Sequence, residues 1–219
     1  HYVLSYDAER TILIRHEAYP YLIPKELVPP KWVYLSSVGE HTEAFHNELL
    51  EWLRAHRETK LAFQPGTFQI KMGKEKLAGL YAIAEVVAVN KEEAERILEI
   101  GETGIKELLE KMRALGPKIA LITDGTNGAY ASDGAQVLKV PMYPDQSPPA
   151  NRTGAGDAMT STFVAALALG KSLEEALLWG PVNSMSVVQH IGAQKGLLTR
   201  AELEKLLTSA PAEYRVLPL

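Results

Sequence analysis

The chain has 219 residues, of which 46% are hydrophobic and 23% are charged, and its formal net charge is −4. This is the composition of a soluble globular domain, and the 27 acidic residues outnumber the 23 basic ones, so no basic surface for nucleic acid is expected. The sequence contains no cysteine, which excludes disulfides and thiolate zinc ligands, and no apolar run approaches the roughly 20 residues of a membrane helix.

The absence of cysteine fits a reducing compartment, so we expect a cytoplasmic protein without nucleic-acid or membrane partners. The chain begins with His1 rather than Met and enters strand-like sequence at once. We therefore expect a fragment, a processed product or a form that omits upstream sequence. The six histidines show no metal-ligand spacing, and surface or structural roles are expected for them.

The N-terminal segment predicts a small β-hairpin. Residues 2–5 and 11–16 are rich in β-forming side chains, and Asp7-Ala8-Glu9 between them is typical of a turn. A proline-rich connection over residues 20–30 then leads into the larger part of the chain.

Strand and helix patterns alternate over residues 32–122. Short apolar runs predict buried strands, and apolar residues at helical spacing predict the helices between them. The expected strands are residues 32–35, 60–63, 86–89 and 119–122, and the expected helices are residues 42–56, 74–81, 91–100 and 103–115. This alternation indicates a mostly parallel sheet with helices on both faces.

The C-terminal part predicts a hairpin and three helices. The hairpin joins residues 128–132 to 136–140 and turns at Asp133-Gly134. After a proline-rich loop, the expected helices are residues 155–169, 173–190 and 199–207. Gly170 has the position of a helix C′ residue, and Thr199 with Glu202 has the spacing of a capping box.

The strongest chemical signal is Asn-Arg-Thr-Gly-Ala-Gly-Asp at residues 151–157, directly before an apolar helix. Small residues let the backbone approach a ligand, and the N–H groups and dipole of a helix N-terminus favour an anion. Gly154, Ala155 and Gly156 would then form an anion hole for a phosphoryl group. Asp157 would be the base that accepts the proton of an attacking hydroxyl. The simpler interpretation is a glycine loop in which Asp157 only complements the helix dipole.

Two weaker signals follow other predicted strands. Asn90 and Glu93 have a spacing that suits a nucleotide phosphate and the water shell of Mg²⁺, but the same spacing makes a capping box. Thr123, Gly125 and Gly128 lie at a strand end, where open α/β sheets bind ligands, and are expected to line the nucleotide. Their simpler interpretation is an Asn-Gly turn between strands. The order of the three motifs along successive strand ends favours phosphate binding.

Two further loops follow predicted strands. Residues 36–40 and 64–69 either border the acceptor or, as we favour, form ordinary turns, the second of them at Pro65-Gly66.

On these motifs the chain resembles the ribokinase-like carbohydrate kinases, the PfkB family. Residues 151–159 resemble the C-terminal signature of that family, and Gly192-Ala193 follows in the family's order. The resemblance implies a three-layer α/β/α sandwich with a mostly parallel sheet and a small β lid. It also implies that residues 1–18 are a remnant of the lid, and that residues 19–219 are an α/β nucleotide-binding kinase domain that lacks its N-terminal part.

The resemblance further implies ATP-dependent, Mg²⁺-assisted phosphorylation of a sugar, sugar phosphate or nucleoside. Glu93 would hold Mg²⁺ through water, and Asn183 would either touch the base edge of the nucleotide or cap a proline-kinked turn. Asn151 stands where many members have an acidic residue that helps to hold a monovalent cation, and it offers K⁺ only a neutral carbonyl oxygen. The lid implies a homodimer as the expected assembly.

Two other classes of function are considered. A non-catalytic nucleotide-binding fragment or pseudokinase is favoured by the absence of the acceptor-binding half. A dinucleotide-binding oxidoreductase is disfavoured, because no G-x-G-x-x-G follows a strand with an acidic residue about 20 positions later.

Overall fold

The computed structural model describes residues 2–6, 9–13, 17 and 19–219. Strands β1 (Tyr2–Tyr6) and β2 (Glu9–Leu13) pair in antiparallel register, with Tyr2 opposite Leu13. This pairing confirms the predicted hairpin. The predicted turn residues Asp7 and Ala8, and residues 14–16 at the end of the second predicted strand, lie outside the described residues.

A seven-stranded mixed sheet has the strand order β3-β4-β5-β6-β7-β8-β9. β3 pairs parallel with β4, β4 pairs parallel with β5, and β8 pairs antiparallel with β9. The strands are β3 (Trp32–Leu35), β4 (Lys60–Phe63), β5 (Ala84–Asn90), β6 (Ile119–Thr123), β7 (Ala129–Ser132), β8 (Val137–Val140) and β9 (Leu217–Pro218). The predicted α/β class is therefore confirmed.

The chain divides into two compact units. Unit 1 comprises residues 1–15, 123–130 and 138–219, and unit 2 comprises residues 16–122 and 131–137. Unit 2 is nearly continuous in sequence, whereas unit 1 combines both ends of the chain with the segment that follows β6.

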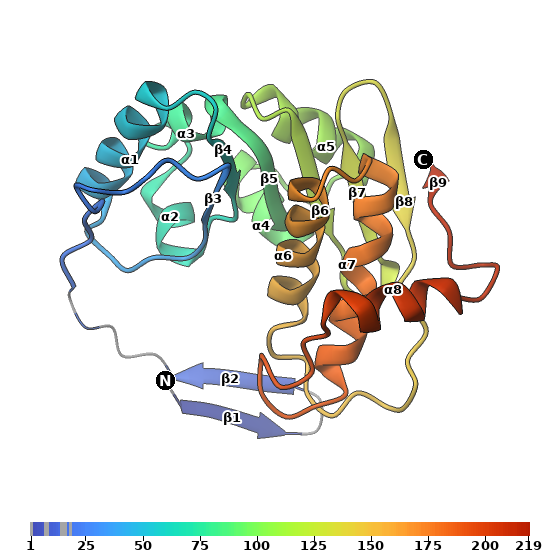
Figure 1. Ribbon diagram of the computed structural model, residues 1–219. Helices are drawn as coiled ribbons and strands as arrows, with labels where there is room; N and C mark the ends of the chain where they lie inside the picture. Colours follow the sequence, from blue (N-terminus) through green and yellow to red (C-terminus); the bar gives the residue numbers. More distant parts are fainter. Residues whose placement is uncertain (1, 7–8, 14–16, 18) are drawn as a thin grey trace. The chain divides into compact units, whose positions relative to one another are not determined.

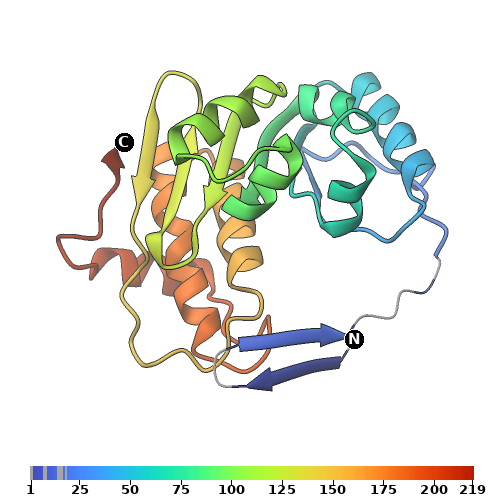
Figure 2. The same cartoon turned by 180° about the vertical axis from the view of Figure 1, so that it is seen from behind.

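Unit 2 contains the parallel strands β3, β4 and β5 with their helices. The helices are α1 (Glu43–Ala55), α2 (Thr67–Met72), α3 (Ala78–Ile83), α4 (Lys91–Leu98) and α5 (Ile105–Ala114). α4 contacts both α5 and β5, on the side of unit 2 that Figure 2 shows. Residues 61–63 and 86–89 are buried without a break, as expected for strands covered on both faces.

The segment between β4 and β5 differs from the prediction. One helix was expected over residues 74–81, but the structure has α2 before this range and α3 at its end. Gly73 ends α2 with a φ of 95°, a conformation that favours glycine. Where a turn is predicted at Pro65-Gly66, the structure instead has Gly66 as the N-cap of α2, so the sequence signal marks the start of a short helix.

Unit 1 is built around a pair of adjacent helices, α6 (Ala155–Ala168) and α7 (Leu173–Val188), and α8 (Arg200–Thr208) packs against α7 (Figure 1). Gly170 follows α6 with a φ of 83°, and the N–H of Lys171 donates to the carbonyl of Ala166 at 3.0 Å. These features confirm Gly170 as the C′ residue of a Schellman motif. The capping box predicted at Thr199 is also present.

The short strand β9 escapes prediction because two residues carry no periodicity. It belongs to a C-terminal segment that Tyr143 and Tyr214 hold in place, with ring centroids 4.8 Å apart. The Tyr143 hydroxyl donates to the carbonyl of Leu206 at 2.9 Å, and the Tyr214 hydroxyl donates to the carbonyl of Leu178. Burial raises the pKa of Tyr214.

None of the helices in the described part of the chain combines the length and apolar character that crossing a bilayer requires.

Gly180 on α7 provides a test of the close packing between α6 and α7. A Cβ atom at Gly180 would lie 2.9 Å from the backbone oxygen of Met159 on α6, well inside van der Waals contact. We expect Gly180→Val to force the helices apart and to lower the free energy of unfolding by about 1–3 kcal/mol, measured by chemical denaturation.

Gly101→Val is the matched control, because Gly101 is exposed and a Cβ atom there meets no atom within 4 Å. Equal stability of the two variants would contradict close packing at Gly180.

Candidate active site

The glycine motif forms a tight turn at the N-terminus of α6. Gly154, the N-cap residue, has a φ of 84°, and a Cβ atom there would lie 2.7 Å from the Cβ of Ala193. The Asn151 Oδ1 accepts a hydrogen bond from the N–H of Thr153 at 2.7 Å. The turn thus requires a glycine at position 154 for two reasons, its backbone conformation and its close approach to Ala193.

The loop before this turn is attached to the C-terminal end of α7. The N–H groups of Ala150 and Asn151 both donate to the carbonyl of Val188, at 2.8 and 3.2 Å. The Ser147 hydroxyl donates to the Gln189 side chain. Because the last carbonyls of a helix have no partner within it, the loop both satisfies α7 and positions the start of α6.

A pocket of about 250 Å³ lies within unit 1. It includes predicted site residues from two separate segments, the loop after β6 and the start of α6. The predicted residues in its wall are Thr123, Gly125, Gly128, Ala155 and Gly156. The structure therefore brings these two motifs together in one cavity.

The glycines of the pocket differ in what surrounds them. A Cβ atom at Gly125 or Gly156 would meet no atom within 4 Å, so both leave open space for a ligand. Gly125 also has a φ of 50°. A Cβ atom at Gly128 would instead overlap the carbonyl of Val140, and Gly128 has a φ of 97°. Position 128 therefore requires glycine for packing and backbone conformation, rather than to leave room for a ligand.

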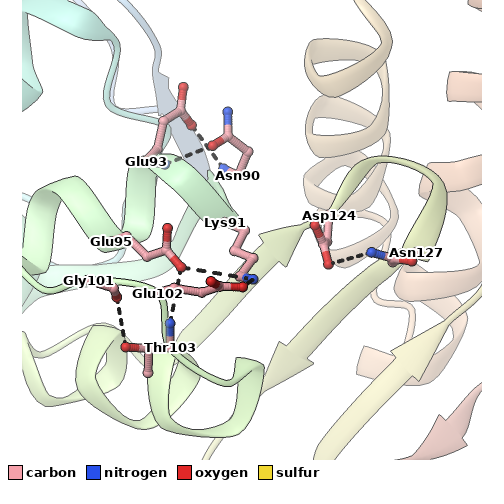
Figure 3. A network of polar contacts seen from close by, with 9 residues as sticks. All are labelled: Asn90, Lys91, Glu93, Glu95, Gly101, Glu102, Thr103, Asp124 and Asn127. Atoms are coloured by element: carbon pink, nitrogen blue, oxygen red, sulfur yellow. Dashed lines mark hydrogen bonds and ion pairs between the residues drawn. The ribbon is translucent and has the colours of Figure 1, made fainter.

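A short 3₁₀ turn, Gly125–Asn127, shapes the loop between β6 and β7. The N–H of Asp124 donates to the carbonyl of Gly128 at 2.9 Å, and the Asn127 side-chain amide donates to the Asp124 carboxylate at 3.0 Å (Figure 3). These bonds hold residues 124–128 in one compact turn at the wall of the pocket.

Asp157 lies in the first turn of α6, directly after the pocket residue Gly156, and it is exposed. Its backbone carbonyl accepts a hydrogen bond from the Ser161 hydroxyl at 2.7 Å. The carboxylate is thus accessible from solvent at the helix end where the first N–H groups lack partners within the helix. Its role as a base stays a prediction.

Asn90 and Glu93, in unit 2, form the capping box of α4. The Asn90 Oδ1 accepts from the N–H of Glu93 at 2.8 Å, and the Glu93 carboxylate accepts from the N–H of Asn90 at 2.9 Å (Figure 3). The simpler interpretation of this pair is confirmed. A contact with phosphate or with Mg²⁺ through water stays a prediction.

Asn183 is 6% exposed and connects three parts of unit 1. Its side-chain amide donates to the Thr162 hydroxyl on α6 at 2.7 Å, and its Oδ1 accepts from the N–H of Leu198 at 3.0 Å. Its neighbours on α7, Pro181 and Ser184, line the pocket. Contact between Asn183 and a nucleotide base stays a prediction.

The residues that surround the pocket fit a nucleotide better than they fit a metal ion held by protein ligands. Among the described residues, no group of three or more His, Cys, Asp or Glu side chains could hold a metal. Open space at Gly125 and Gly156 suits phosphate groups, whereas the side-chain oxygen of Asn151 is engaged by Thr153. Within the part of the chain that the structure describes, the buried hydroxyl of Thr153 has no hydrogen-bond partner.

The wall of the pocket also includes residues that the sequence did not predict. These residues come from the loop before the motif, from the motif itself and from the adjoining faces of α6 and α7. They are Met142, Asp145, Pro149, Arg152, Met159, Pro181, Ser184 and Val188, together with Thr126 and Ala129. Only Arg152 carried a local signal, since it lies inside the glycine motif.

Known proteins resemble the chain in sequence and in fold. The pfkB family of carbohydrate kinases matches residues 1–200. Ribokinase from Bacillus subtilis (strain 168) is 39% identical over 95 residues, which are 43% of this chain and 32% of that protein. The structure of Methanocaldococcus jannaschii nucleoside kinase superposes with a TM-score of 0.68 at 24% identity, covering 84% of this chain and 60% of that one.

The structure of Arabidopsis thaliana ribokinase complexed with ribose and ATP has a TM-score of 0.68 at 22% identity. It covers 81% of this chain and 55% of the plant protein. The chain thus spans less than two thirds of each relative. Because the family match extends over residues 1–200 and the fold agrees with these structures, the chain belongs to the pfkB family of carbohydrate kinases.

Proposed function

We propose that the chain carries the nucleotide site and the catalytic base of an ATP-dependent kinase that phosphorylates a hydroxyl of a sugar, sugar phosphate or nucleoside. The observation that carries this proposal is a glycine-lined pocket that reaches the N-terminus of α6, next to the exposed Asp157. Family membership supports the reaction class, and the relatives named above are two ribokinases and a nucleoside kinase.

The pocket suits the two ends of a nucleotide. Met142, Pro149 and Val188 offer apolar wall to a base. Gly125 and Gly156 leave room for phosphates, which the N–H groups and dipole of α6 would stabilise. Arg152 adds a positive charge to the same wall and would complement the phosphates.

Asp157 would act as the base of the transfer. Its carboxylate would accept the acceptor's hydroxyl proton while that oxygen forms a bond to the γ-phosphorus and the bond to the ADP leaving group breaks. The amides of Gly154, Ala155 and Gly156 would hold the charge that spreads over the equatorial oxygens. In this assignment the base and the anion hole share one helix end.

Mg²⁺ would neutralise phosphate charge when it is bound, largely through phosphate oxygens and water. Glu93 would hold its water shell, with Asn90 beside it, and Asn183 would reach the base edge. Asn151 offers K⁺ at most one neutral oxygen, which already accepts from Thr153, so we propose a weak dependence on K⁺.

We further propose that residues 1–18 are part of a small β lid, that residues 19–219 are the kinase domain, and that the protein is a cytoplasmic homodimer joined through the lid. The exposed apolar side chains of Tyr2, Leu4 and Leu13 on β1 and β2 support a covered lid face.

A non-catalytic nucleotide-binding role is the second candidate. It is favoured by a pocket that residues 123–129 and 142–188 of unit 1 line by themselves. ATP binding in calorimetry, without turnover of any sugar or nucleoside by the full-length protein, would support this role over catalysis.

Replacing Asp157 tests the base. Asp157→Asn keeps the shape of the side chain but removes its ability to take a proton, so we expect kcat to fall about 10²–10⁴-fold with little change in ATP affinity. Steady-state kinetics and calorimetry on the full-length protein provide both values. The control is Asp133→Asn, since the Asp133 Oδ1 only accepts turn hydrogen bonds that an amide oxygen can also accept. Normal turnover by Asp157→Asn would exclude it as the base.

A substitution at Gly156 tests ligand binding separately from folding. Gly156→Val adds a side chain that meets no protein atom within 4 Å of its Cβ, so we expect an unchanged melting temperature. The same side chain would fill phosphate space, and we expect the Kd for ATP to rise about tenfold or more, which is about 1.4 kcal/mol. Gly101→Val again serves as the control. Unchanged ATP affinity would place the phosphates elsewhere.

A further inference from the structure

A buried polar network lies in unit 2, where the parallel strands β3 and β4 end. Leu35 and Phe63, the last residues of the two strands, are register partners, so the loops that follow leave the sheet at the same edge. His46 on α1 is 2% exposed and Gln69 on α2 is 0% exposed. Open α/β sheets bind ligands at this edge, and the proposed mechanism assigns no role to these two side chains.

Gln69 connects the two loops through all of its side-chain groups. Its Oε1 accepts from the N–H of Gly66 at 2.7 Å, and its Nε2 donates to the carbonyl of Ser36 at 3.0 Å. Because the Gly66 N–H can only donate and the Ser36 carbonyl can only accept, the orientation of the Gln69 amide is determined. The remaining N–H of Gln69 faces the Nε2 of His46 at 3.2 Å.

The network also determines the tautomer of His46. Its Nδ1 lies 2.6 Å from the carbonyl of Thr42 and must donate, so its Nε2 is the acceptor for Gln69. A proton on Nε2 would point at the amide N–H of Gln69 and leave two donors facing each other. The network is therefore complete only while His46 is neutral.

Burial lowers the pKa of His46, and this outweighs the opposite effect of its hydrogen bond to the Thr42 carbonyl. Among the described residues, the groups recorded in contact with the ring are neutral, namely Gln69 from α2, Phe45 from α1 at 5.8 Å between ring centroids, and Thr42. Neutral His46 is therefore maintained at neutral pH by its surroundings.

The two loops also touch each other directly. A Cβ atom at Gly66 would overlap the side chain of Ser37. The loop after β4 (residues 64–66) therefore lies directly against the loop after β3 (residues 36–40), with no space between them. Further bonds support the β3 loop, since the Thr42 hydroxyl donates to the carbonyl of Gly39 at 3.0 Å and the Gly39 N–H donates to the Tyr21 hydroxyl at 3.0 Å. A shift of Gln69 would therefore move both loops together.

The side chains of these loops are suited to hydroxyl groups. Ser37 is exposed, Gln64 is half-buried, and neither loop contains Lys or Arg in residues 36–40 or 64–66. The neutral side chains and the exposed carboxylate of Glu40 can bond the hydroxyls of a polyol, whereas a phosphate ester would call for a cation.

We propose that Gln69 and His46 are positioning residues for the acceptor, and that they act by holding the loops 36–40 and 64–66 in the arrangement that receives uncharged hydroxyl groups. This inference rests on the proposed kinase activity, which supplies the acceptor. Neither side chain touches substrate, since both are buried beneath the loops.

The first test uses the full-length protein and separates the two substrates kinetically. Gln69→Met keeps the size of the side chain and removes its three hydrogen bonds, so we expect the KM of the acceptor to rise about tenfold or more, with the KM of ATP within about twofold. Gln136→Met is the matched control, since Gln136 is half-buried in the loop between β7 and β8 and is not part of the network. Equal changes in the two KM values, or no change, would overturn the proposal.

The second test uses pH and does not require that the Gln69→Met variant folds. A lowered pKa means that His46 is neutral, and the network intact, above its ordinary value of about 6.5, and that the network is lost as the pH falls through the lowered value. We expect the acceptor KM of the wild type to rise over this acid range. His46→Gln, whose amide oxygen can accept from Gln69, should keep a low acceptor KM and abolish the rise.

A pH profile that His46→Gln leaves unchanged would overturn the role of His46. Failure of the kinase proposal has a different signature, because the wild type would then phosphorylate no acceptor of a sugar and nucleoside panel, and the acceptor role would be excluded with it. Turnover by the wild type with an unaltered acceptor KM in Gln69→Met would overturn only the positioning role.

Discussion

Two main-chain hydrogen bonds to one carbonyl, that of Val188, hold the proposed active-site turn in unit 1. The end of α7 has carbonyls without partners inside the helix, and the loop before the glycine motif supplies N–H groups from Ala150 and Asn151 to one of them. α6 therefore starts at a defined place on α7, and the pocket between their ends has a defined wall. The contact of Gly154 with Ala193 then leaves only glycine at the turn.

Buried amide side chains play the same physical part in both units. Asn183 joins α6 to the segment at Leu198, and Gln69 joins the loops after β3 and β4. Each satisfies part-buried backbone groups that would otherwise lack this partner, and for a fully buried group such a loss costs about 1–3 kcal/mol. Loops fixed in this way can present functional groups without large apolar contacts of their own.

Most caps and turns that local sequence determines were predicted correctly, although the short helix α2 was missed, whereas contacts between distant residues were largely not predicted. Gly170, Thr199 and the start of α6 follow from residues within a few positions of each other, as turns and caps do. The pocket wall was missed because Met142, Pro149 and Val188 converge only in the folded chain. His46 and Gln69 are 23 positions apart, and nothing near either residue signals their pairing.

The apolar part of the pocket wall includes two methionines, Met142 and Met159. A thioether side chain has several rotatable bonds and a polarisable sulfur, so it adapts its shape to what it contacts. A base held between such walls would be retained by dispersion and shape more than by directional bonds.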